Sequence, residues 1–140
     1  MRARLSVLVV LAASPALLGM TAPDTATRFG QVCSGIETVK FGAQPPQRAV
    51  YTIALSIDLV ARRYCYATCS SGQSYAIADA AASPVKLADI DAPGQQRHML
   101  LDRGTARLTD DQRMVMGPIV VARHATATCT AGPFREPPAP

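Results

Sequence analysis

The sequence contains no tryptophan and no asparagine, and only 5% of its residues are aromatic. Without asparagine there is no acceptor for N-linked glycosylation. The chain has two histidines, His98 and His124, and no G-x-S-x-G motif, so it lacks the usual signature of a nucleophile with an activating base. It also lacks a phosphate-binding glycine loop, a zinc-binding pattern and an EF-hand loop. We therefore predict no catalytic residue, no cofactor and no enzymatic activity.

Two pairs of acidic residues resemble catalytic carboxylates only superficially. Asp89 and Asp91 stand two residues apart, which is the spacing of neighbours on the solvated face of a strand. Asp110 and Asp111 follow Thr109 in an order typical of a turn or a helix cap. Glycoside hydrolysis needs two carboxylates in one cleft, and no sequence signature singles out such a pair.

Positive charge is scattered along the chain. After the N-terminal segment, 12 of the 14 basic residues stand against 10 acidic ones. Only Arg62 and Arg63 are adjacent, and a solvated hairpin edge accounts for them. A nucleic-acid partner would require clustered cations, ideally interleaved with aromatic residues. We therefore expect no nucleic-acid partner.

The chain begins with the pattern of a secretory signal peptide. Two arginines precede an apolar run from Leu5 to Leu18. We predict a signal peptide over residues 1–22, with cleavage between about 16 and 26. A membrane span needs roughly 20 apolar residues, and the first cysteine, Cys33, lies too far downstream for a lipid anchor. The mature protein is thus expected in the periplasm or the medium, without a membrane span.

The mature region is rich in strand signals. From Val50 to Leu59 apolar and polar residues alternate, which predicts a half-buried strand, and a second strand follows as far as Tyr66. Further strand signals occur over Phe29–Cys33, Ile36–Phe41, Ser74–Ala78, Val85–Ile90, Gln96–Leu101 and Ile119–Cys129. This pattern predicts one mainly β domain over residues 28–130, an antiparallel meander forming a sandwich or an up-and-down barrel.

Two short segments have helical features, and the chain ends in a proline-rich stretch. Tyr75–Ala82 is rich in alanine, and Thr109–Gln112 has the spacing of a capping box, with a polar turn as the alternative. We expect at most one or two short helices there. The last ten residues, 131–140, include four prolines, which predicts a flexible tail.

Four cysteines, at positions 33, 65, 69 and 129, form an even set in a chain predicted to be exported. This favours two disulfides, for which three pairings exist. We favour Cys65–Cys69, which closes a short segment at a strand end, and Cys33–Cys129, which ties the first strand to the last. In the chain-entropy model the long loop stabilises the fold by about 4 to 5 kcal/mol and the short one by about 2 kcal/mol.

A second interpretation of Cys65 and Cys69 is copper or thiol redox chemistry. Their C-x-x-x-C spacing resembles the copper-binding motif of the synthesis-of-cytochrome-oxidase family over five residues. The resemblance implies that two thiolates and a histidine hold the metal, and soft sulfur ligands suit Cu(I). The other ligands in the sequence are His98, His124, Met99, Met114 and Met116. That family alternates strands with long helices, a pattern absent here, so a structural disulfide is the favoured interpretation.

Over most of its mature length the chain resembles short, uncharacterised exported proteins of high-GC proteobacteria. The shared features are the signal peptide, Cys33-Ser34-Gly35, a strand ending Ile57-Asp58-Leu59, the pair Cys65 and Cys69, and a hairpin from Asp102 to Thr105. This resemblance implies no activity. Two hypotheses follow from the sequence. One is a non-catalytic exported domain that binds a small apolar ligand or an envelope component; the other is a periplasmic copper or thiol redox protein.

Overall fold

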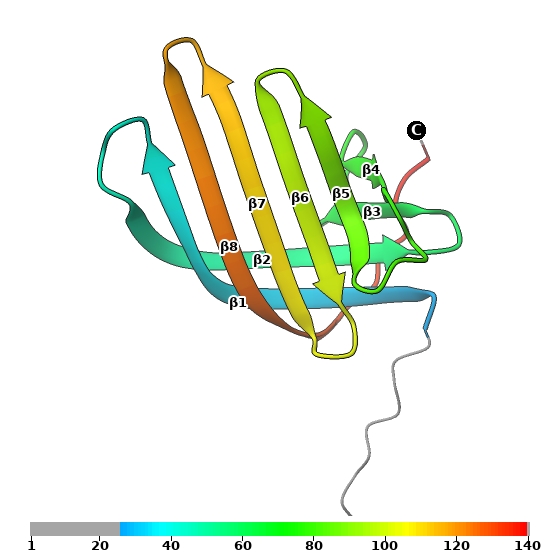
Figure 1. Ribbon diagram of the computed structural model, residues 1–140. Coiled ribbons are helices and arrows are strands. Elements are labelled where there is room, and N and C mark those ends of the chain that lie inside the picture. Colours follow the sequence, from blue (N-terminus) through cyan, green and yellow to red (C-terminus); the bar gives the residue numbers. More distant parts are fainter. Residues whose placement is uncertain (1–25, 140) are drawn as a thin grey trace, which may run out of the picture.

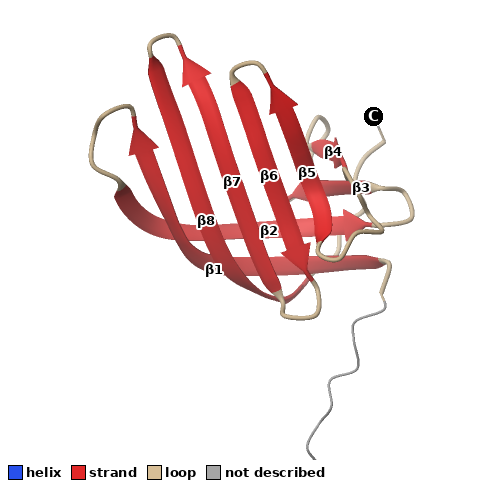
Figure 2. Ribbon diagram, in the orientation of Figure 1, coloured by secondary structure: helices blue, strands red, loops and turns tan. Residues whose placement is uncertain are grey.

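The computed structural model describes residues 26–139. Within this range the regular secondary structure consists entirely of β-strands (Figures 1 and 2). The signal peptide predicted over residues 1–22 lies outside the described residues. The strands are β1 Arg28–Phe41, β2 Gln47–Asp58, β3 Arg63–Tyr66, β4 Ser74–Ala76, β5 Val85–Ala92, β6 Gln95–Asp102, β7 Arg107–Met116 and β8 Ile119–Gly132. No membrane-spanning helix is found among residues 26–139.

The strands form one antiparallel meander that curls into a nearly closed barrel. Their order in the sheet is β4-β3-β2-β1-β8-β7-β6-β5, so the first strand also pairs with the last. Between β4 and β5 an isolated bridge from Asp79 to Lys86 takes the place of a ladder. Figure 1 shows β1 and β2 crossing behind β5–β8, which encloses the interior. The predicted mainly β meander is confirmed, in its barrel form.

The alternation predicted for Val50 to Leu59 is present in β2. Tyr51, Leu55 and Ile57 point inward and are at most 6% exposed. The two strand segments predicted before Phe41 join into the single strand β1, which continues its ladders to β2 and β8 through Gly35. A side chain would not fit at Gly35, because a Cβ would lie 1.9 Å from the carbonyl oxygen of Thr126.

Neither segment with helical features forms a helix. Residues 74–76 form β4, and Thr109–Gln112 lies in the middle of β7. There β7 pairs with β6 on one side and β8 on the other. Because both ladders satisfy its backbone hydrogen-bonding groups, the local capping pattern has no role.

The core fills one end of the barrel, the end that carries the β6–β7 turn. Its most buried large side chains come from β2 and β5–β7, and each is at most 2% exposed: Leu55, Ile57, Leu87, Met99, Leu101 and Leu108. The opposite end carries the β1–β2, β5–β6 and β7–β8 turns (Figure 1), and we name it the hairpin end.

Residues 133–139 lie along the outer side of β2 and β3. The Arg135 N–H donates to Ser56 Oγ at 2.9 Å, and the Arg63 guanidinium donates to the Pro138 carbonyl oxygen at 2.6 Å. This cover explains why Ser56, on the outward face of β2, is only 2% exposed. The flexibility expected for residues 131–140 stays a prediction, and the first two of these residues complete β8.

Candidate functional site

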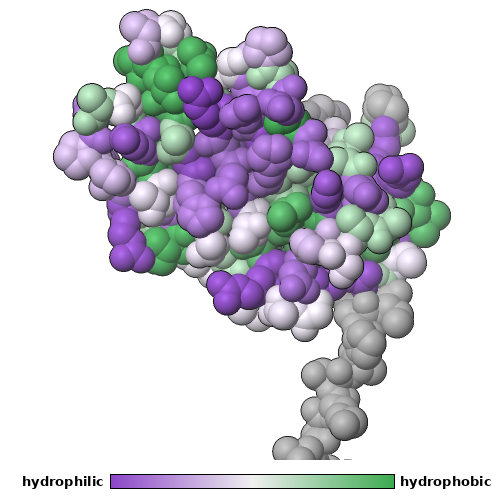
Figure 3. All heavy atoms as spheres, viewed as in Figure 1, coloured by the Kyte–Doolittle hydropathy of each residue, from purple (hydrophilic) through white to green (hydrophobic). Residues whose placement is uncertain are grey.

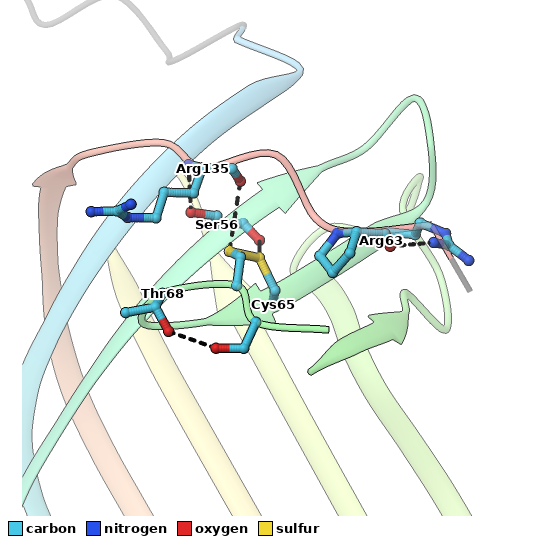
Figure 4. The surroundings of a disulfide bond; sticks show 8 residues. Ser56, Arg63, Cys65, Thr68 and Arg135 are labelled. Atoms are coloured by element: carbon cyan, nitrogen blue, oxygen red, sulfur yellow. Dashed lines mark hydrogen bonds between the residues drawn. A yellow bond between two sulfur atoms is a disulfide. The ribbon is translucent and has the colours of Figure 1, made fainter. Parts of the chain in front are cut away.

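The disulfide between Cys65 and Cys69 closes the turn after β3, and the C-terminal segment passes over it (Figure 4). Cys65 is fully buried. Cys69 Sγ lies 3.7 Å from the carbonyl oxygen of Arg135 in that segment. Figure 4 also shows Ser56 beside the disulfide, on the neighbouring strand β2. The two sulfurs are bonded to each other, with Cys65 fully buried and Cys69 partly exposed beside the C-terminal segment. These are the surroundings of a structural disulfide.

The residues of the copper hypothesis are not brought together. Cys65 lies on β3, whereas His98 lies on β6 and His124 on β8, and neither of these strands neighbours β3 in the sheet. Met99 is fully buried in the core. Among residues 26–139, no group of three or more His, Cys, Asp or Glu side chains is placed to hold a metal ion.

The other disulfide joins Cys33 of β1 to Cys129 of β8, at positions that face each other in the ladder. The two residues are 0% and 4% exposed. They stand 96 positions apart in the sequence. These are the two pairings favoured from the sequence. This disulfide fastens together the two strands whose pairing closes the meander.

A cluster of charged and polar side chains lies between the packed core and the hairpin end. Its centre is Asp110 of β7, whose side chain has no exposed surface. Arg97 donates to both carboxylate oxygens at 3.0 Å, and Arg123 donates to one of them at 2.7 Å. The Tyr51 hydroxyl donates to the same oxygen at 3.2 Å. Arg123 also lies 3.6 Å from a carboxylate oxygen of Glu37.

The electrostatics of this cluster keep its charges in place. Burial lowers the pKa of Arg97, but the hydrogen bonds and attraction of Asp110 outweigh it and leave this pKa raised. Burial, followed by the negative charge of Asp110, raises the pKa of Tyr51. Arg97 lies over the Tyr66 ring at 5.8 Å, and Arg123 over the Tyr51 ring at 5.5 Å. Both carboxylate oxygens of Asp110 already accept hydrogen bonds from neighbouring side chains. We therefore interpret the cluster as structural.

The prediction that Asp110 and Asp111 occupy a turn or a cap is wrong. Both lie within β7, where successive side chains point to opposite faces. Asp110 therefore faces inward with Leu108, while Asp111 faces outward and is half exposed. Asp89 and Asp91 are exposed, as expected for a solvated face.

The outer face carries a row of acidic and histidine side chains on four neighbouring strands. The register places Asp89, His98, Asp111 and His124 side by side on β5–β8. Nδ1 of His98 lies 2.8 Å from Asp89, and Nδ1 of His124 lies 2.5 Å from Asp111. The pKa of Asp89 is lowered, chiefly by its hydrogen bond with His98. All four side chains are about half exposed and are accessible to a ligand.

An open pocket of about 380 Å³ lies beside this row. Ala122 of β8 is paired with Arg113 on β7 and with Lys40 on β1. A small residue between two long cations leaves space on the surface. His98 and His124 also line this pocket.

Exposed apolar side chains gather at the hairpin end of the barrel, around the β7–β8 turn. Phe41, Met114, Val115, Met116 and Ile119 are each 38% to 55% exposed there, and we name these five residues the apolar tip. Met116 pairs with Ile119 beside the β7–β8 turn, and these two residues and Phe41 line an open hollow of about 630 Å³. Figure 3 shows a hydrophobic region at the end of the β7–β8 hairpin, next to a hydrophilic surface over the middle of the sheet.

Three cations lie close behind the apolar tip. Lys40 directly precedes Phe41, Arg113 directly precedes Met114, and Arg48 is the second residue of β2, paired with Thr38 on β1. Within the described residues, none of the three cations takes part in an ion pair. This arrangement was not predicted from the sequence, because the register of the hairpins creates it. The available signal was the run Met114–Val120, which is apolar on both sides of a Gly-Pro turn.

Comparison with known protein families, with curated proteins and with solved structures found no match.

Proposed function

We propose that the mature chain is an exported, non-catalytic binding domain that attaches to an anionic lipid surface of the cell envelope through the apolar tip. The observation that carries this proposal is the gathering of five exposed apolar side chains at one end, beside three cations that form no ion pair within residues 26–139. Large exposed apolar patches mark interaction sites. The signal-peptide pattern and the two disulfides support export.

The geometry favours a lipid surface over a small apolar ligand held inside the barrel. The apolar tip lies at the ends of strands and hairpins, and the interior below it is occupied by the Asp110 cluster and the packed core.

A lipid surface is also favoured over a second copy of this chain. Two copies facing each other through the tip would bring Lys40, Arg48 and Arg113 together with their counterparts, and these like charges repel.

The energies are those of reversible attachment. A fully buried large apolar side chain contributes about 1.5 to 3 kcal/mol, so each half-exposed tip residue would add about 1 kcal/mol. Each cation near an anionic surface adds about 1 kcal/mol, and salt weakens this contribution. Neither the tip nor the cations would suffice alone, which makes attachment dependent on anionic lipid.

Vesicle sedimentation tests the proposal. We expect the mature protein to sediment with phosphatidylglycerol vesicles and not with phosphatidylcholine vesicles. The double variant Met116→Ser with Ile119→Ser should lose most of this binding. Val60→Ser is the matched control, because Val60 is 74% exposed in the turn after β2, away from the tip.

Two results would overturn the proposal. One is the absence of binding to either vesicle. The other is concentration-dependent dimerisation without lipid that the Met116→Ser, Ile119→Ser variant abolishes, since the tip would then be an interface between copies.

The copper or thiol redox hypothesis is not proposed as a second function. It requires Cys65 and Cys69 as accessible thiols near a histidine. The structure instead holds them in a disulfide beneath the C-terminal segment, on a strand that is not a neighbour of those bearing His98 and His124.

A further inference from the structure

Cationic and histidine side chains line the outer-face pocket. Arg113 and Lys40 stand on either side of Ala122, and the walls include His98 and His124. The guanidinium and ammonium groups carry permanent positive charge and have no ion-pair partner among residues 26–139. An anion in this pocket would meet charge that the fold itself leaves uncompensated.

The two histidines are oriented by their carboxylate partners. Nδ1 of His98 is engaged by Asp89, and Nδ1 of His124 is engaged by Asp111. In each ring Nε2 is therefore the nitrogen left for a ligand. A neutral ring in this arrangement accepts at Nε2, whereas a protonated ring donates there. Protonation of both rings would therefore give the pocket two further hydrogen-bond donors.

The charged groups around each ring include both signs. His98 is faced by Asp89 from β5 and by Asp111 from β7, and Asp89 also forms an ion pair with Lys86. His124 of β8 has Asp111 as its cross-strand partner on β7 and Thr38 as its partner on β1. The other charged side chains that line the pocket are Arg113, Arg123 and Lys40. Asp111 is the single carboxylate along the described pocket wall, and its hydrogen bond to His124 occupies it.

The pocket adjoins the apolar tip. Lys40 and Arg113 each precede a tip residue by one position, and one residue of strand spans about 3.3 Å. If the tip enters the boundary between headgroups and acyl chains, about 5 to 10 Å deep, the pocket lies at the level of the headgroups.

We propose that this pocket binds a phosphate monoester, as carried by an anionic lipid headgroup. The inference rests on the proposed attachment to membranes. A phosphate monoester presents three acceptor oxygens and up to two negative charges, which matches two permanent cations and two histidine nitrogens better than a singly charged diester does. Arg113 and Lys40 would hold the phosphate, and His98 and His124 would add donors when protonated.

The test compares vesicles containing phosphatidic acid, a monoester, with vesicles containing phosphatidylglycerol, a diester, at equal surface charge. At about pH 6 we expect the wild-type protein to bind the monoester vesicles about tenfold more tightly, the worth of roughly one charge-assisted hydrogen bond. The double variant His98→Gln with His124→Gln should lose this preference while still binding phosphatidylglycerol. Arg113→Gln should weaken binding to both, and Arg107→Gln, at the other end of β7, serves as the charge-matched control.

The outcomes separate this inference from the proposed function. Equal binding to both lipids overturns the phosphate pocket and leaves membrane attachment standing. Preference for phosphatidic acid that survives the histidine substitutions also overturns it. Binding to neither vesicle overturns both proposals. Glycerol 3-phosphate distinguishes a free phosphate monoester from a lipid headgroup. If it binds saturably without vesicles, and the Arg113→Gln variant loses this binding, the pocket takes a free ligand. If it only competes with binding at the vesicle surface, the pocket takes the lipid headgroup.

Discussion

Asp110 determines how the barrel interior is organised. A fully buried carboxylate is costly unless it is paired and hydrogen-bonded. Here Arg97, Arg123 and Tyr51 all donate to it, so strands β2, β6 and β8 are each linked to β7 by one side chain. The cluster thus sets the boundary between the packed core and the hairpin end.

Asp110→Asn should destabilise the fold strongly. The substitution leaves Arg97 inside the barrel without its counter-ion and leaves Arg123 with Glu37 alone. Breaking a buried ion pair costs about 3 to 5 kcal/mol. Asp111→Asn, next to it on the outer face, should change the free energy of unfolding by about 1 kcal/mol or less. Urea unfolding of both variants measures the difference. Equal effects would show that the buried cluster contributes little.

Asp58 should make stability depend on pH at its acidic end. Its carboxylate accepts hydrogen bonds from the Ala61 N–H at 2.8 Å and from Arg28 at 2.7 Å, and these lower its pKa in the folded protein. A lowered folded pKa gives stability that is present above the unfolded value of about 3.9 and lost as pH falls through the folded value. Wild-type protein should exceed Asp58→Asn in stability at neutral pH, and the gap should shrink below about pH 4. A gap independent of pH would contradict this role.

At the scale of elements, the alternation of apolar and polar residues predicted β2 but gave no signal for β7. In β2, apolar side chains alternate with polar ones, so the period of two is visible in the sequence. In β7 the inward positions include Asp110, and its outward positions near the turn include Val115, so polarity no longer marks the buried face. The capping pattern at Thr109 then gave a misleading local signal. The Asp110 cluster was not predictable, because it depends on strands far apart in the sequence. For the apolar tip the sequence held only a local signal, the apolar run Met114–Val120, which does not indicate that Phe41 of β1 joins it.

The C-terminal segment should protect the disulfide that it covers. Deleting residues 133–140 removes the hydrogen bonds to Ser56 and Arg63 and the contact with Cys69. We expect dithiothreitol to reduce Cys65–Cys69 faster in the truncated protein than in the full chain. Alkylation of the released thiols and mass measurement give the rate. Cys33–Cys129 is the internal control, and its rate of reduction should change less. An unchanged rate for Cys65–Cys69 would mean that the segment does not limit access to it.

At the scale of the whole molecule, the two disulfides differ in what they constrain. Cys33–Cys129 joins the first and last strands across 96 positions, whereas Cys65–Cys69 spans only 4. Replacing Cys33 and Cys129 by alanine should lower the free energy of unfolding by about 4 kcal/mol, and replacing the other pair should lower it by about 2 kcal/mol. Chemical unfolding without reductant measures both. A larger loss from the Cys65 and Cys69 variant would contradict this assignment.

The molecule is a barrel that is packed at one end, crossed inside by a buried charged cluster, and apolar and cationic at the β7–β8 hairpin. The absence of tryptophan allows a direct test of membrane attachment. Met116→Trp places a single fluorophore in the apolar tip, and Val60→Trp places one in the turn after β2. On addition of phosphatidylglycerol vesicles, we expect a blue shift and quenching by brominated acyl chains for Met116→Trp alone. An unchanged spectrum for Met116→Trp, or the same shift for both variants, would contradict it.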